Sequence, residues 1–71
     1  MQLETLAHID AAIRDVLTRI ARQRDFVEEF AAKGYDMRAP LSLLSSLLLN
    51  LRRLEHQRRE LATEAEDIVG V

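Results

Sequence analysis

The 71-residue chain contains no cysteine and no tryptophan, only one proline and two glycines, and three aromatic side chains. Without cysteine, disulfide bonds and thiolate metal sites are excluded. Below roughly 70–80 residues, a single core usually needs disulfides, a metal, oligomerisation or very regular helix packing. Two histidines, His8 and His56, are too few for a metal-dependent fold, so oligomerisation or regular helix packing remains.

The chain also lacks a long apolar run and a strong charge of one sign. Its most apolar stretch, 41–54, holds eight leucines in fourteen residues, whereas a membrane-spanning helix needs about 20 apolar residues. Residues 1–5 lack the basic start and apolar run of a signal peptide, so we expect a cytoplasmic protein with no membrane partner. The formal net charge of −2 gives no general attraction to nucleic acid or anionic lipid.

What the chain has is helical periodicity. Apolar residues make up 48 % and charged residues 31 %, a balance typical of globular rather than disordered chains. Between residues 3 and 33, apolar positions recur in alternating steps of three and four, which predicts a helix about 45 Å long with a heptad seam. The seam positions are Leu6, Ile9, Ile13, Val16, Ile20, Gln23, Val27 and Phe30.

A turn over 34–39 is predicted to connect this helix to a second one over about 40–67. Gly34 suits the left-handed residue after a helix, and Asp36 is a good N-cap. If Asp36 caps, Pro40 is the fourth helical residue; if Ala39 caps, Pro40 is the first. Such a short connection predicts antiparallel neighbours. The second seam is Leu44, Leu47, Leu51, Leu54, Arg58, Leu61, Ala65 and Ile68.

When the chain folds about this turn, every seam residue of the first helix lies opposite a seam residue of the second. The predicted layers are Phe30 with Leu44, Val27 with Leu47, Gln23 with Leu51, Ile20 with Leu54, Val16 with Arg58, Ile13 with Leu61, Ile9 with Ala65 and Leu6 with Ile68. The predicted fold is therefore all-α, a single domain over 1–71 built as a coiled-coil-like antiparallel two-helix hairpin.

Several large apolar residues lie outside the two seams, most of them near the turn. A monomer rarely exposes such a patch, because burying one leucine stabilises by roughly 1.5–3 kcal/mol. A second copy would double the core in a homodimeric four-helix bundle, and another helical protein could cover the same surface. The candidate interface residues are Phe26, Phe30, Leu41, Leu43, Leu48, Leu49 and Leu17.

Arginines gather in the middle of both predicted helices. Such a belt could follow phosphates in RNA or DNA, with Arg22, Arg52, Arg53 and Arg59 as candidate contacts. Acidic residues interrupt the belt, however, and pairs four residues apart favour a solvated face of salt bridges. Those pairs are Asp15 with Arg19 and Glu55 with Arg59. The polar seam residues Gln23 and Arg58 are interpreted as fixing register and reaching solvent.

No constellation for catalysis is visible. The chain offers no nucleophile beside a base, no phosphate-binding loop and no paired carboxylates in a cleft, and His8 and His56 both face outward on the heptad. We expect a non-enzymatic chain with no cofactor, metal or small-molecule substrate. The leading hypothesis is a self-associating, regulatory protein–protein interaction module that uses the Leu-rich face of the second helix; the alternative is a nucleic-acid-binding hairpin dimer.

Four short patterns support the hairpin by resemblance. They are Ile20-Ala21-Arg22-Gln23, Gly34-Tyr35-Asp36, Leu43-Leu44 with Leu47 and Leu51, and His56-Gln57-Arg58-Arg59. Over residues 8–61 the chain resembles a group of short, uncharacterised bacterial helical-hairpin proteins of alphaproteobacterial type. In that group a threonine usually follows the aspartate, where this chain has Met37, and Pro40 is also atypical. The resemblance implies the fold and carries no activity.

Overall fold

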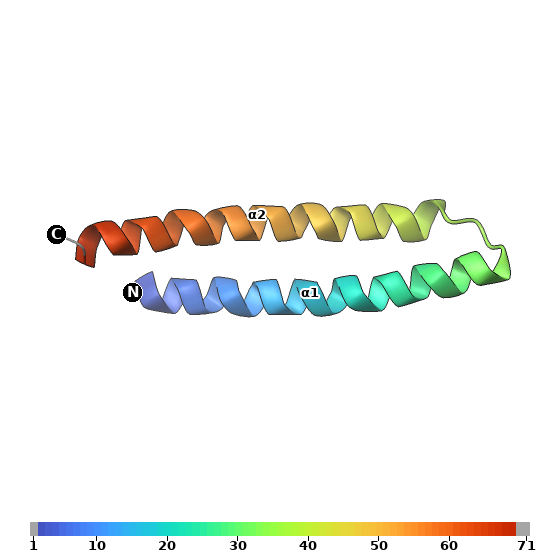
Figure 1. Ribbon diagram of the computed structural model, residues 1–71, viewed down its shortest axis with the longest axis horizontal. Helices are drawn as coiled ribbons and strands as arrows, with labels where there is room; N and C mark the ends of the chain where they lie inside the picture. The colour runs from blue at the N-terminus through green and yellow to red at the C-terminus, as the bar shows by residue number, and fades with distance from the viewer. Residues whose placement is uncertain (1, 70–71) are drawn as a thin grey trace.

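The computed structural model describes the backbone of residues 2–69 and the side chains of residues 5–64. Helices α1 (Gln2–Lys33) and α2 (Arg38–Val69) lie side by side in opposite directions, and this part of the chain contains no strand (Figure 1). The all-α hairpin predicted from the sequence is confirmed. The second helix begins two residues earlier than the predicted residue 40 and extends past 67.

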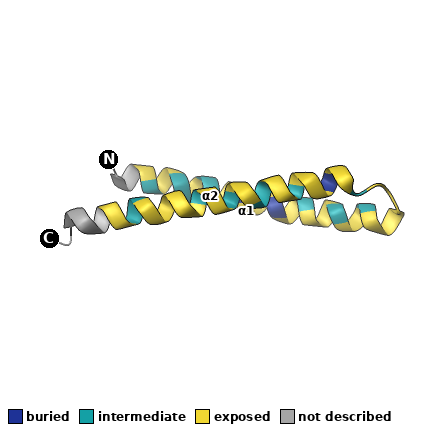
Figure 2. Cartoon of the chain, turned by 90° about the horizontal axis from the view of Figure 1, so that it is seen from above, coloured by how far each residue is buried: buried dark blue, intermediate teal, exposed yellow. Residues whose placement is uncertain are grey.

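The hairpin is a rod with little interior. Its principal extents are 58 × 15 × 14 Å and its radius of gyration is 16.6 Å, against about 11 Å for a compact chain of this length. Exposed and intermediate positions dominate both helices (Figure 2). Among the described side chains, only Val16, Ile20 and Pro40 are buried, with Val16 5 % and Ile20 4 % exposed. Within residues 2–69, neither helix has a stretch apolar enough to cross a membrane.

The end of α1 is fixed by its backbone. The amide of Gly34 donates to the carbonyl of Ala31 (3.1 Å), and the amide of Tyr35 donates to the carbonyl of Phe30 (3.1 Å). These two bonds form a Schellman motif, in which Gly34 takes the left-handed conformation with φ 74°. The rings of Phe30 and Tyr35 meet edge to face at 5.0 Å, which supplies the apolar contact typical of this motif.

The start of α2 differs from both arrangements expected for it. The Leu41 amide donates to the Met37 carbonyl (3.0 Å), so Met37 holds the N-cap position and Pro40 is the third helical residue. Proline is tolerated there because that amide would have no helical partner. Asp36 accepts from the Arg38 amide (3.0 Å). Its pKa is lowered, first by the hydrogen bond from the Arg38 side chain and then by that from the Arg38 amide.

The pairing of the helices differs from the predicted layers by about one heptad. The Gln23 Nε2 donates to the Pro40 carbonyl (2.9 Å), although the prediction placed Gln23 opposite Leu51. Leu51 lies eleven residues, or about 16 Å, further along α2, which is too far for a glutamine side chain. Figure 1 shows the corresponding offset, because α1 projects past the start of α2 at the turn and α2 projects past α1 at the other end.

A second contact fixes the same shift. Arg58 pairs with Asp10, six residues before the predicted neighbour Val16. Residues 65–71 lie outside the described side chains, so the predicted layers of Ala65 and Ile68 are not described. The shift keeps apolar residues facing apolar residues, since a heptad seam moved by seven residues presents the same pattern. It also gives both polar seam residues, Gln23 and Arg58, a partner on the opposite helix.

Candidate interaction surface

The seam divides the hairpin surface into two flanks. In antiparallel helices with heptad seams, the e positions of both helices share one flank and the g positions share the other. The Phe26 flank is the g side, with Arg19 and Phe26 on α1 and Leu43 and Asn50 on α2. The Leu17 flank is the e side, formed by Asp10, Leu17 and Arg24 on α1 and by Leu41, Leu48 and Glu55 on α2.

The large exposed apolar residues of the Phe26 flank lie near the turn. An open hollow of about 460 Å³ is lined there by Gln23, Phe26, Phe30, Ala39, Pro40 and Leu43. Phe26 is 43 % and Leu43 52 % exposed, and the Phe26 ring stacks in a tilted fashion on Phe30 with centroids 4.3 Å apart. The adjoining hollow is lined partly by Arg19 and Arg22, so this flank becomes cationic toward the middle of the hairpin.

The Leu17 flank carries leucines from its middle to the turn. Leu17 is 48 % and Leu41 47 % exposed, and Leu48 is half-buried. Asp10 accepts a hydrogen bond from the Arg58 Nε toward the free end, where the Arg58 side chain leaves the seam. This flank therefore has leucines from its centre to the start of α2, with Asp10 and Glu55 toward the free end and Arg24 toward the turn.

The seven predicted interface residues do not share one face. Phe26, Phe30 and Leu43 belong with the hollow near the turn, whereas Leu17, Leu41 and Leu48 lie on the opposite flank. Leu49 is 60 % exposed and falls at an f position, on the outer side of α2. The Leu-rich stretch of α2 is thus spread around the helix, because successive helical residues diverge by about 100°.

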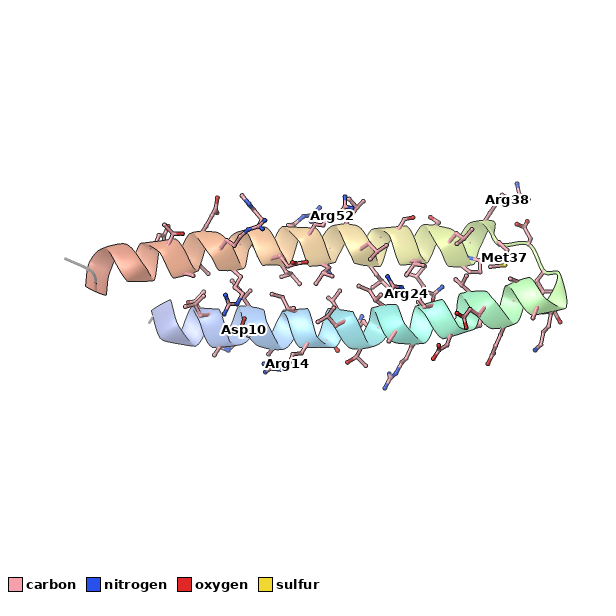
Figure 3. The ribbon with its side chains drawn as sticks, viewed as in Figure 1. Asp10, Arg14, Arg24, Met37, Arg38 and Arg52 are labelled. Carbon is pink, nitrogen blue, oxygen red and sulfur yellow. The ribbon has the colours of Figure 1, made fainter. Side chains whose placement is uncertain are left out.

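The four predicted nucleic-acid contacts are also separated. Arg22 and Arg53 fall at c positions on the outer edges of α1 and α2, so the hairpin's full width lies between them. Arg52 and Arg59 fall at b positions of α2, on the side of the Leu17 flank. Figure 3 shows Arg14 and Arg52 projecting outward from opposite edges of the hairpin.

The ion pairs agree only partly with those predicted. Arg19 pairs with Asp15 at 3.0 Å, as expected, with both side chains more than half exposed. Glu55 and Arg59, both described, form no ion pair, whereas His56 Nε2 lies 3.0 Å from Glu60 Oε1. Within the described residues, no three His, Asp or Glu side chains lie close enough to hold a metal ion.

Two contacts with structural consequences were missed from the sequence: Asp10 with Arg58, and Gln23 with the Pro40 carbonyl. Both depend on the register, and a backbone acceptor such as Pro40 leaves no signal in side-chain patterns. Comparison of the chain with protein-family models, curated proteins and solved structures found no match. The resemblance to short bacterial hairpin proteins therefore stays a prediction.

Proposed function

We propose that this chain is a small, non-enzymatic protein–protein interaction module that self-associates as a dimeric four-helix bundle. One observation carries the proposal: among the described side chains of the seam, only Val16 and Ile20 are buried, beside six large apolar side chains that are exposed. Two buried side chains make a very small core for a chain of this length. A second hairpin would cover the remaining apolar surface.

The exposed area supports a partner of similar size. The chain exposes 5653 Å², whereas a compact folded monomer of 8.1 kDa exposes about 4,500 Å². The excess is about 1,150 Å² per chain. Two chains that covered this excess would bury about 2,300 Å² together, which lies in the range of obligate homodimers.

The nucleic-acid hypothesis has no specific observation in its favour. Its four arginines are divided between the two sides of the hairpin, and Arg19 and Arg58 of the same belt are engaged by Asp15 and Asp10. A surface that follows phosphates requires cations gathered along one path. We therefore retain self-association as the proposed function.

Sedimentation equilibrium tests the proposal, with helicity measured by circular dichroism over a dilution series. A mass near twice 8.1 kDa, with helix lost on dissociation, is the expected result. A helical chain that sediments as a monomer at every concentration would refute self-association. A salt-dependent affinity for an unrelated duplex or single strand would favour the nucleic-acid hypothesis instead.

A further inference from the structure

We infer that the second copy docks on the Leu17 flank in an antiparallel orientation, with the two turns at opposite ends of the bundle. This inference rests on the proposed self-association and adds the surface and the orientation. The surface is defined by Asp10, Leu17, Arg24, Leu41, Leu48 and Glu55.

Taken over its whole length, the Leu17 flank carries more apolar residues than the Phe26 flank. In the described part of the chain, its e positions carry apolar residues at Leu17, Ala31, Leu41, Leu48 and Ala62, and charged residues at the other three. Helices that face a core on two sides show apolar residues at a, d and one adjoining heptad position. On the Phe26 flank the large exposed apolar residues Phe26 and Leu43 lie near the turn, so a second copy docked there would cover few large apolar side chains along the free halves.

The charges on α1 are self-complementary about Leu17. Asp10 lies seven residues before Leu17 and Arg24 seven residues after it, all three at e positions. When two copies of α1 run antiparallel with Leu17 at the two-fold axis, each Asp10 meets the Arg24 of the other copy. The same axis passes close to Leu48 on α2, which places Leu48 against its own copy.

The opposite orientation is disfavoured by charge. If the two turns lay at the same end, the e positions of α1 would face those of α2 from the other copy. Leu17 would still meet Leu48, but Asp10 would then face Glu55. Like charges at such positions select against a pairing, and opposite charges set partner orientation. Among the described residues, neither Arg24 nor Glu55 forms an ion pair within the hairpin, so Arg24 is available to a second copy.

Two matched substitutions test the surface. Leu17→Glu and Leu43→Glu each place a carboxylate at a leucine that is about half exposed, 48 % and 52 % respectively, on opposite flanks. By sedimentation equilibrium, we expect Leu17→Glu to weaken the dimer at least tenfold and Leu43→Glu to leave it intact. The reverse result would overturn the choice of flank while leaving self-association standing. A parent chain that is monomeric would refute the proposed function as well.

A mixing experiment tests the orientation. In the antiparallel homodimer, residue 10 of each copy faces residue 24 of the other. Asp10→Arg therefore creates two pairs of facing positive charges, and Arg24→Asp creates two pairs of facing negative charges. Each variant alone should dimerise more weakly than the parent. An equimolar mixture should form heterodimers that are tighter than either homodimer, because each unlike-charge pair is restored across the interface; Asp10→Arg still lacks its contact with Arg58, so full parent affinity is not required. Failure of the mixture to recover, measured by sedimentation with one variant fluorescently labelled, would overturn the antiparallel arrangement. Because the chains themselves are unchanged on mixing, recovery is not explained by the folding of either variant.

Discussion

Replacing the two polar seam residues should loosen the register of the hairpin. In the observed register, Gln23 donates to the Pro40 carbonyl and Arg58 pairs with Asp10. In the register displaced by one heptad, these side chains would face Leu51 and Val16 and would lose both partners. A double variant with Gln23→Leu and Arg58→Leu removes the polar contacts that distinguish the two registers. It keeps every seam layer apolar.

The magnitude follows from the exposure of the two groups. A polar group left unsatisfied costs about 1–3 kcal/mol when buried, and Gln23 is half-buried, so about 1 kcal/mol is appropriate. The Arg58–Asp10 pair is 48 % and 36 % exposed at its side chains, so it adds at most about 1 kcal/mol. Together they favour the observed register by about 1–2 kcal/mol, a factor of about 5–30 in population.

Cysteine cross-linking measures the relative populations of the two registers. The chain has no cysteine of its own, so only the introduced pair can form a disulfide within it. Arg19 and Asn50 lie one heptad further along the flank than Phe26 and Leu43, which line one hollow. Cysteines at Arg19 and Asn50 therefore report the observed register, and cysteines at Arg19 and Gln57 report the displaced one. The displacement of about 10 Å exceeds the roughly 7 Å limit between Cα atoms for a disulfide.

The expected result is a rise of about 5- to 30-fold in the relative yield of the displaced cross-link when Gln23 and Arg58 become leucine. Non-reducing electrophoresis separates the intramolecular disulfide from cross-linked dimers. An unchanged ratio of the two cross-links would refute the reasoning that the polar seam contacts select the register, and the turn would then have to set it.

Three further predictions concern the ends and centre of the hairpin. Gly34→Ala should lower the free energy of unfolding by about 1–2 kcal/mol, because Gly34 has φ 74° while an added Cβ meets no atom within 4 Å; chemical denaturation checks this, and no loss would contradict the backbone argument. Ile20→Ala should cost about 2–5 kcal/mol by the same assay, and Leu49→Ala, at a 60 % exposed position, less than about 1 kcal/mol; equal losses would show that burial in the hairpin does not determine stability. The pKa of Asp36 is lowered from 3.8 by Arg38, so the stability it supplies is full above about pH 4 and disappears as pH falls through the lower folded pKa. Acid titrations of helicity for the parent and Asp36→Asn should therefore differ at neutral pH and converge in strong acid, and a constant difference would rule this out.

The sequence alone determined the local structure. The alternating steps of three and four residues require two helices with one apolar seam each, since only that period keeps the seam on one side. Gly34 determined where α1 ends, because a left-handed residue favours glycine and its amide closes the Schellman motif. The surplus of leucines between residues 41 and 54 was equally plain from the sequence, because eight leucines in fourteen residues exceed one helical stripe.

Only the tertiary structure decided the register of the two helices. A heptad seam is nearly unchanged by a shift of seven residues, so the apolar pattern permits both registers; Gln23 and Arg58 find partners in the observed one. That register also brings Asp10 beside Arg58. The division of the surplus side chains, with Leu17, Leu41 and Leu48 on one flank and Phe26 and Leu43 on the other, follows by contrast from the heptad positions, which a shift of seven residues leaves unchanged.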